Sequence, residues 1–349
     1  MPIKVLIVDD SILVQKLLKD IINSEEDMEV MAVASDPYIA REIISKEKPD
    51  IITLDIDMPK MNGLTFLKSL KKHYPIPTLI ISTLTRKDSD MEIRALELGA
   101  YDVVEKPSMF TKDSFYKSKQ EIIEKIRASI YIDKLREFNF SDECINYSKN
   151  SILSKNIKSE KIVVIGASTG GPEAVYKVIK NLPENYYSVI VVMHMPERFT
   201  NSYAARLNNS CKMNVKEAED GDCLIRGRVL IAPGNHNLYV KKCEEKDKYF
   251  VIIKKDEPYK HYRPSINLTL FSLAKASGNN VTAIILTGMG DDGAEGMDIL
   301  KKKGAYTIAQ DEESSVVYGM PKAAISKKCV DKILDLDEIA IELESLLKI

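Results

Sequence analysis

The chain has 349 residues, which at roughly 150 residues per domain predicts two domains. Its 44% of hydrophobic residues is too high for a disordered chain, and 50 Lys and Arg residues against 52 Asp and Glu residues leave a net charge of −2. Because no basic excess is available to displace counterions from phosphates, the composition argues against a protein that mainly binds nucleic acid.

Short apolar runs alternate with amphipathic stretches over the first hundred residues. The amphipathic stretches repeat apolar residues at helical spacing, as Leu13, Leu17 and Ile21 do. This alternation predicts βαβ units, and therefore a parallel sheet covered by helices on both faces. A further helix is expected over residues 115–130. The five predicted strands are Ile3–Val8, Met28–Ala34, Ile51–Leu54, Thr78–Ser82 and 101–104.

Charged and polar side chains follow four of these runs, where the strands end. They are Asp9 and Asp10 after the first, Asp55 after the third, Ser82 and Thr83 at the end of the fourth, and Lys106 after the fifth. Because parallel strands end at a common edge, we expect these side chains to converge. Three carboxylates would repel one another without a cation, and oxygen ligands suit Mg²⁺. Any single aspartate could instead cap the next helix, as Asp10 or Ser11 could.

As a set, D-D, D-I-D-M-P-x-M-N-G, S-T and K-P resemble the receiver domain of bacterial two-component response regulators, from residue 3 to about residue 130. The resemblance implies that Asp55 accepts a phosphoryl group from a histidine kinase. It also implies that Asp9 and Asp10 hold Mg²⁺ together with Asp55, and that Lys106 and Ser82 contact the phosphoryl oxygens. Asp57 lies nearby but two residues further along, so we choose Asp55. The family's aromatic switch residue is replaced here by Val103.

A segment rich in Ser, Asn, Lys and Glu separates the two halves of the chain. We predict a linker over residues 137–158, between a receiver domain at 1–136 and a second domain at 159–349. The second domain again alternates strands and helices, which predicts a doubly wound, Rossmann-like parallel sheet. Runs at 239–241 and 249–253 are short and flanked by charges, so they predict an antiparallel hairpin. The predicted strands are 162–165, 189–193, 229–232, 281–286 and 306–309.

The first strand of this domain runs into a turn rich in small residues. Gly166-Ala167-Ser168-Thr169-Gly170 fits G-x-S-x-G, the pattern of a serine held on a sharp turn between strand and helix. Alone, such a turn more often marks a tight connection or a phosphate cradle at a helix N-terminus. It lacks the G-x-G-x-x-G and G-K-[ST] endings of nucleotide-binding loops.

A serine nucleophile needs a base and an orienting carboxylate. Of His73, His194, His236 and His261, only His194 directly ends a predicted strand, so it shares a sheet edge with Ser168. Asp291 and Asp292 follow another strand, although one of the two is expected to cap the next helix. The resulting order Ser, His, Asp differs from the Ser, Asp, His order of the α/β-hydrolase fold, which we therefore exclude.

From about residue 161 to 325, the segments G-A-S-T-G-G, M-H-M-P, V-K-E-A-E-D-G-D, I-A-P-G-N-H, H-Y-R-P-S-I-N, L-T-G-M-G-D-D-G and Q-D-E-E-S-S-V-V-Y-G-M-P resemble the chemotaxis protein-glutamate methylesterase family. The resemblance implies demethylation of receptor glutamate γ-methyl esters, with release of methanol, and deamidation of receptor glutamines. It assigns Ser168 as nucleophile, His194 as base and Asp292 as orienting acid, and requires no metal in this half. The placement of the loops suggests backbone N–H groups of Thr169 and Met289 as oxyanion donors.

A receiver could instead control a nucleotide-binding domain without catalysis or a transcription factor. The first gives His194 no purpose, and the second lacks a helix-turn-helix candidate.

The N-terminus is too acidic for a secretory signal, no run of 18 apolar residues exists, and the five cysteines never form C-x-x-C. We therefore expect a cytoplasmic protein without membrane insertion or nucleic-acid binding. It would act on the cytoplasmic portions of chemoreceptors and receive phosphoryl groups from the chemotaxis histidine kinase.

Overall fold

A computed structural model of the chain describes residues 2–82, 91, 94–96, 98–107, 112–129, 161–243 and 248–347. The chain divides into two compact units, Met1–Asp133 and Lys134–Ile349, and each is described by itself. No helix in the described part of the chain is long and apolar enough to span a membrane. The predicted linker 137–158 and Thr83 lie outside the described residues.

The first unit contains a five-stranded parallel sheet in the order β2-β1-β3-β4-β5. This order is that of flavodoxin-like folds, and its topological switch point lies between β1 and β3. The strands are β1 (Ile3–Val8), β2 (Met28–Ala34), β3 (Ile51–Leu54), β4 (Thr78–Ser82) and β5 (Asp102–Glu105), and the helices are α1 (Ile12–Ile22), α2 (Pro37–Lys46), α3 (Gly63–His73) and α5 (Lys112–Ala128). The apolar residues of β1, β3 and β4 are buried, as expected for a sheet covered on both faces.

The second unit contains a seven-stranded parallel sheet in the order β14-β13-β12-β6-β7-β9-β8 and a separate antiparallel hairpin. The chain enters at the central strand β6, builds one half of the sheet, and then crosses to β12 for the other half. The switch point therefore lies between β6 and β12. The strands are β6 (Ile162–Ala167), β7 (Ser188–Met193), β8 (Asn214–Glu217), β9 (Arg228–Ile231), β12 (Val281–Ile285), β13 (Tyr306–Gln310) and β14 (Lys332–Leu334), and the hairpin is β10 (Asn237–Cys243) with β11 (Lys248–Lys254).

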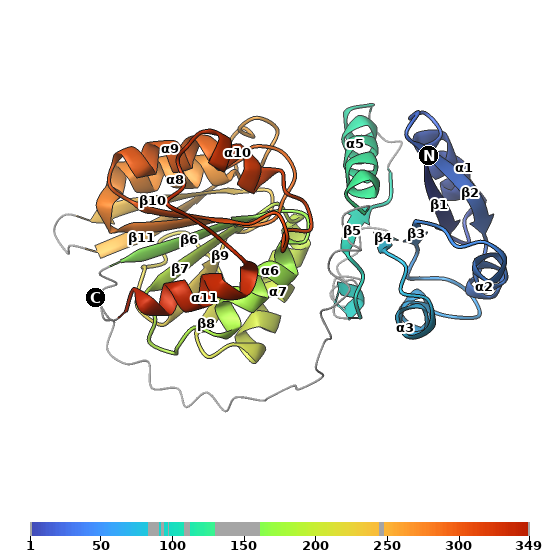
Figure 1. Cartoon of the computed structure of the whole chain (residues 1–349), viewed down its shortest axis with the longest axis horizontal. Helices are drawn as coiled ribbons and strands as arrows, with labels where there is room; N and C mark the ends of the chain where they lie inside the picture. Colours follow the sequence, from blue (N-terminus) through green and yellow to red (C-terminus); the bar gives the residue numbers. More distant parts are fainter. Residues whose placement is uncertain are drawn as a thin grey trace. The chain divides into compact units, whose positions relative to one another are not determined.

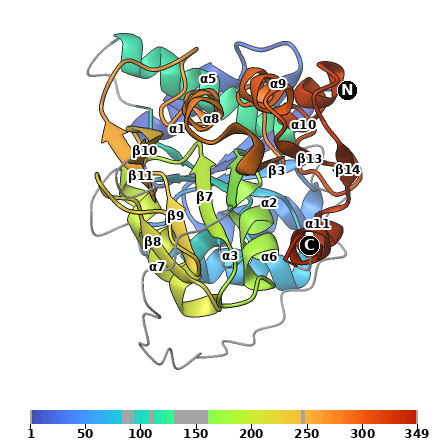
Figure 2. The same cartoon turned by 90° about the vertical axis from the view of Figure 1, so that its left-hand side faces the viewer.

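Helices cover both faces of this sheet, with α6, α7 and α11 on one side and α8, α9 and α10 on the other (Figure 1 and Figure 2). The hairpin packs with α8 over one core cluster, to which Leu238, Val240 and Ile266 contribute buried side chains. The helices are α6 (Gly171–Lys180), α7 (Glu197–Ser210), α8 (Ile266–Ala276), α9 (Ala294–Lys302), α10 (Met320–Ser326) and α11 (Leu336–Ser345), with a short 3₁₀ helix at Gly278–Asn280.

Both sheets confirm the predicted fold class. Every predicted strand, including those of the hairpin, is present with its ends within two residues of the prediction. The edge strands β8 and β14 were not predicted. Their sequences, NVKE and KIL, are short and carry exposed lysine or asparagine at positions that a central strand would bury. Such strands leave little hydrophobic signal, because only part of their surface faces the core.

Candidate functional site

The turn between β6 and α6 presents Ser168 at the carboxyl edge of the sheet. The Ser168 N–H donates to the carbonyl of Thr287 at 3.0 Å, which draws the turn towards the end of β12. Gly170 has φ +77°, and a Cβ there would lie 2.3 Å from Val316. A larger residue at position 170 would be strained at this φ angle, and its Cβ would clash with Val316. This explains why a glycine follows Ser168 and Thr169.

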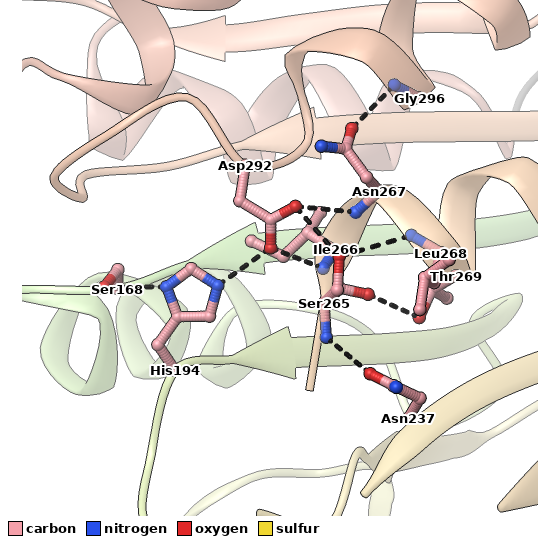
Figure 3. A network of polar contacts seen from close by, with 10 residues as sticks. All are labelled: Ser168, His194, Asn237, Ser265, Ile266, Asn267, Leu268, Thr269, Asp292 and Gly296. Atoms are coloured by element: carbon pink, nitrogen blue, oxygen red, sulfur yellow. Dashed lines mark hydrogen bonds and ion pairs between the residues drawn. The ribbon is translucent and has the colours of Figure 1, made fainter. Parts of the chain in front are cut away.

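Ser168, His194 and Asp292 form one continuous chain of polar contacts (Figure 3). His194 Nδ1 lies 3.1 Å from Ser168 Oγ, and Nε2 lies 2.9 Å from Asp292 Oδ2. An ionised carboxylate can only accept hydrogen bonds. The neutral imidazole of His194 therefore carries its proton on Nε2, towards Asp292, and offers the lone pair of Nδ1 to the serine hydroxyl. The structure thus brings together the three residues that the sequence singled out.

Strand order explains which ring nitrogen faces which partner. β6 and β7 are neighbours, and the His194 N–H donates to the carbonyl of Ala167 at 3.3 Å, so the backbones of His194 and Ser168 lie close together. The nitrogen nearer the backbone, Nδ1, therefore reaches Ser168. The distal nitrogen, Nε2, extends to Asp292 on the loop that follows β12.

The N-terminus of α8 holds the Asp292 carboxylate, which is only 1% exposed. Its oxygens accept from the N–H of Ile266 at 2.7 Å, the N–H of Asn267 at 3.0 Å and the hydroxyl of Ser265 at 3.1 Å (Figure 3). Burial alone would raise the pKa of Asp292, but the interaction with His194 and these backbone donors hold it below the usual range. Asp292 is therefore ionised and fixed in one orientation.

The expectation that one of the two adjacent aspartates caps the next helix is wrong. The residue before α9 is Gly293, with φ +96° and no side-chain cap. Asp292 instead binds the N-terminus of α8, more than twenty residues earlier in the chain. Asp291 is exposed, and its carboxylate lies 3.9 Å from Lys260. Geometry thus favours Asp292 over Asp291 as the partner of His194.

The two proposed oxyanion donors lie on the turns that flank Ser168. Within the described residues, neither the N–H of Thr169 nor that of Met289 donates a hydrogen bond. Gly288 allows the second turn to approach, since a Cβ there would lie 2.8 Å from Ser168 Cβ and 2.3 Å from the sulfur of Met320. Both N–H groups therefore remain available to an acceptor beside Ser168.

One residue at the site was not singled out by sequence reasoning. The Tyr262 ring stacks on the His194 imidazole with ring centroids 4.3 Å apart and planes at 11°. It comes from the turn before α8 and not from a strand end, so the rule that located Ser168, His194 and Asp292 could not find it. His73 ends α3, and His236 lies beside the carbonyl of Gly234; within the described residues, neither histidine hydrogen-bonds to Ser168, His194 or Asp292.

The first unit gathers Asp9, Asp10 and Asp55 at its own switch point. One carboxylate oxygen from each lies within 4.8 Å of the others. The Asp55 N–H donates to the carbonyl of Val8 at 2.9 Å, which places Asp55 beside Asp9. The ammonium of Lys106 lies 2.8 Å from both Asp9 Oδ2 and Asp55 Oδ2.

Burial raises the pKa of Asp55 to about 6, and the nearby charge of Asp9 adds to that effect against the opposing ammonium of Lys106. A buried carboxylate in this position is stabilised in its charged form by a cation. The donor set fits Mg²⁺, because it consists of hard carboxylate oxygens and its third member, Asp10, is exposed to water that could complete the coordination.

The remaining receiver residues lie as follows. Ser82 is buried at the end of β4, where its carbonyl accepts from the N–H of Lys106 at 2.9 Å. Ser11 caps α1, which leaves Asp10 free of that role. Asp57 is exposed and does not join the acidic cluster. Val103 is buried in β5, at the position of the family's aromatic switch residue.

The chain has two α/β units, each built on a parallel sheet, one with an acidic cluster and one with a Ser-His-Asp chain. Together these features define a response regulator joined to a hydrolase. The CheB methylesterase family model matches residues 163–343, and the response regulator receiver domain model matches residues 5–114. This chain belongs to the CheB methylesterase family, as the sequence motifs predicted. A receiver domain carries a Mg²⁺-dependent phosphorylation site.

Relatives match the chain over nearly its whole length. The protein-glutamate methylesterase/protein-glutamine glutaminase 1 of Geobacter metallireducens is 43% identical over 348 residues, which cover 97% of this chain and 94% of that protein. The corresponding protein 2 of Syntrophus aciditrophicus is 43% identical over 341 residues, 98% of each chain. The crystal structure of the Thermotoga maritima CheB methylesterase catalytic domain aligns with a TM-score of 0.52 and 42% identity, covering 54% of this chain and 99% of that one.

Proposed function

We propose that this chain hydrolyses glutamate γ-methyl esters on chemoreceptors to glutamate and methanol, deamidates receptor glutamines, and is regulated by phosphorylation of Asp55. The observation that carries the proposal is the continuous contact from Ser168 through His194 to the buried Asp292, at 3.1 and 2.9 Å. The nucleotide-binding alternative gives this chain of contacts no role. The proposed division remains a receiver at 1–136, a linker at 137–158 and the methylesterase domain at 159–349.

In the first half of the reaction, Ser168 Oγ attacks the γ-carbonyl carbon while His194 Nδ1 takes the hydroxyl proton. The N–H groups of Thr169 and Met289 donate to the oxyanion that forms, and one such donor is typically worth roughly 3 kcal/mol. Asp292 stabilises the imidazolium through Nε2–H. When the intermediate collapses, His194 returns the proton to the departing oxygen, so methanol leaves and a glutamyl ester of Ser168 remains.

In the second half, water attacks the glutamyl ester with His194 again as the base. Collapse of this intermediate returns the proton to Ser168 Oγ and releases the glutamate side chain. A primary amide follows the same path with ammonia as the leaving group, because both substrates pass through similar tetrahedral intermediates. None of these steps requires a metal ion, and none of the three residues is part of the acidic cluster.

In the receiver, Asp55 is the proposed phosphoryl acceptor, with the chemotaxis histidine kinase as donor. Asp9, Asp10 and Asp55 would hold Mg²⁺, which when bound neutralises charge on the transferring phosphoryl group. Lys106 lies 2.8 Å from Asp55 and would pair with a phosphoryl oxygen. Ser82 ends β4, the strand next to β3, and would contact a phosphoryl oxygen as well. The added negative charge would reorient these donors. The proposed substrates are the cytoplasmic portions of methyl-accepting chemoreceptors, consistent with the names of the relatives.

A single site for both reactions makes a testable prediction about His194. His194→Gln removes the base of both, so release of methanol from methyl-esterified receptor and release of ammonia from glutamine-bearing receptor should each fall by at least about 10⁴-fold. Volatile methanol and free ammonia are measured in parallel. His236→Gln is the matched control, because that half-buried histidine contacts the carbonyl of Gly234 and the Glu197 carboxylate, at 3.0 and 3.9 Å, and none of the three proposed catalytic residues; it should retain both activities. Loss of one activity with retention of the other would contradict a shared site.

A further inference from the structure

The stack between Tyr262 and His194 fixes a degree of freedom that the polar contacts leave open. Hydrogen bonds at Nδ1 and Nε2 determine where the edge of the imidazole points, but they only weakly restrain the tilt of its plane. The Tyr262 ring, nearly parallel to the imidazole at 11° with centroids 4.3 Å apart, restrains that tilt directly.

Tyr262 is the last residue of a turn, 259–262, whose backbone is strained. The turn closes through two reciprocal hydrogen bonds, from the N–H of Tyr259 to the carbonyl of Tyr262 at 3.1 Å and back at 3.0 Å. Its two central residues, Lys260 and His261, have φ of 49° and 76° although neither is glycine. Non-glycine residues in this region persist only where the surrounding structure imposes the conformation, and they are frequent at functional sites.

The surrounding structure that holds this turn is the start of α9. Glu295 accepts from the Tyr259 hydroxyl at 3.0 Å and from the Lys260 ammonium at 2.8 Å. Glu295 follows Asp292 by three residues, so the turn that carries Tyr262 is tied to the segment that carries the carboxylate partner of His194.

The loop before Asp292 is also shaped around the tyrosine. Gly290 has φ +86°, and a Cβ at this position would lie 2.4 Å from the Tyr262 hydroxyl oxygen. Any other residue at 290 would push the tyrosine or the loop away. The glycine of M-G-D-D-G thus lets the Tyr262 ring and the Asp292 loop approach each other beside the imidazole.

We propose that Tyr262 is a positioning residue, which holds the His194 imidazole in the plane that aligns Nδ1 with Ser168 and Nε2 with Asp292, and that the turn 259–262 anchored on Glu295 holds Tyr262 in place. This inference rests on the proposed function. The ring, and not the hydroxyl, carries the effect.

The test compares Tyr262→Leu with Tyr262→Phe in the full chain, using methanol release from methyl-esterified receptor. Tyr262→Leu should lower kcat by between about tenfold and a hundredfold, the range for a lost aromatic pair and a misplaced base, with KM changed less than about threefold. Tyr262→Phe keeps the ring and should restore kcat to within about threefold of wild type. Tyr306→Leu is the matched control, because this half-buried tyrosine lies on β13 and bonds Glu342.

A spectroscopic measurement reports the stack independently of turnover. The ring protons of His194, assigned by their loss in His194→Gln, should shift downfield in Tyr262→Leu, because the ring current of the stacked tyrosine is removed, and should stay near the wild-type position in Tyr262→Phe. Glu295→Gln weakens the anchor of the turn and should give an intermediate shift and an intermediate kcat.

Three outcomes would overturn the inference: an unchanged kcat in Tyr262→Leu, equal losses in the Leu and Phe variants, or unmoved His194 ring protons. The failure of the proposed function looks different, since wild-type protein would then release no methanol at all. A wild-type enzyme that is active and a Tyr262→Leu variant that is equally active would remove only the role of Tyr262.

Discussion

Ser168→Ala is expected to abolish methanol release, with a loss of at least about 10⁴-fold relative to wild type. The substitution removes the proposed nucleophile, the hydroxyl that would form the covalent glutamyl intermediate, and it would leave His194 without a group to deprotonate. The turn itself should survive, because it is held by the backbone hydrogen bond from Ser168 to Thr287 and by the glycines that follow.

The measurement is methanol release from a methylated receptor, together with thermal unfolding to show that the variant keeps its fold. Ser210→Ala, at the end of α7, controls for removal of a partly buried serine hydroxyl outside the site. A Ser168→Ala variant that turned over at the wild-type rate would eliminate the serine nucleophile and with it the proposed mechanism.

Asp292→Asn should lower turnover by on the order of 10³- to 10⁴-fold while the protein still folds. Each carboxylate oxygen of Asp292 accepts a hydrogen bond from a backbone N–H, one from Ile266 and the other from Asn267. The side-chain NH₂ of an asparagine would therefore face a second donor in either orientation. We expect the free energy of unfolding to fall by about 1–3 kcal/mol for this mismatch. The greater effect is on catalysis, because the buried negative charge that stabilises the imidazolium is lost.

Asp291→Asn provides the control within the same loop. The Asp291 carboxylate is exposed and forms a distant ion pair with Lys260, at 3.9 Å, so turnover and unfolding free energy should both stay close to wild type. If the large loss occurred in Asp291→Asn and not in Asp292→Asn, the assignment of the carboxylate partner of His194 would be reversed.

The sequence predicted those parts of the protein that depend on buried parallel strands. Continuous apolar runs located the central strands, and polar residues that follow those runs proved to converge. Asp9 and Asp55 come directly after β1 and β3. Ser168 comes directly after β6 and Asp292 lies on the loop after β12, on either side of the second switch point. This success has a simple cause, namely that strand ends in a parallel sheet meet at one edge.

The features that were not predicted depend on contacts between irregular segments. The N-terminus of α8 binds Asp292, and no local pattern links two segments more than twenty residues apart. Tyr262 reaches His194 from a turn whose positive φ angles fall on Lys260 and His261, where glycine or asparagine would have signalled the turn. The choice between the two nitrogens of His194 follows from strand adjacency, which the sequence does not reveal.

One measurement tests directly whether a phosphorylated receiver controls a serine esterase on the same chain. Methanol release from methylated receptor is followed with Mg²⁺, with and without a small phosphodonor such as acetyl phosphate, on wild type and on Asp55→Asn. We expect the phosphodonor to change the rate of the wild-type enzyme, and Asp55→Asn to keep the basal rate without responding. If the wild-type chain released no methanol, the proposed esterase activity would be wrong. If Asp55→Asn responded as fully as wild type, the proposed control through Asp55 would be wrong.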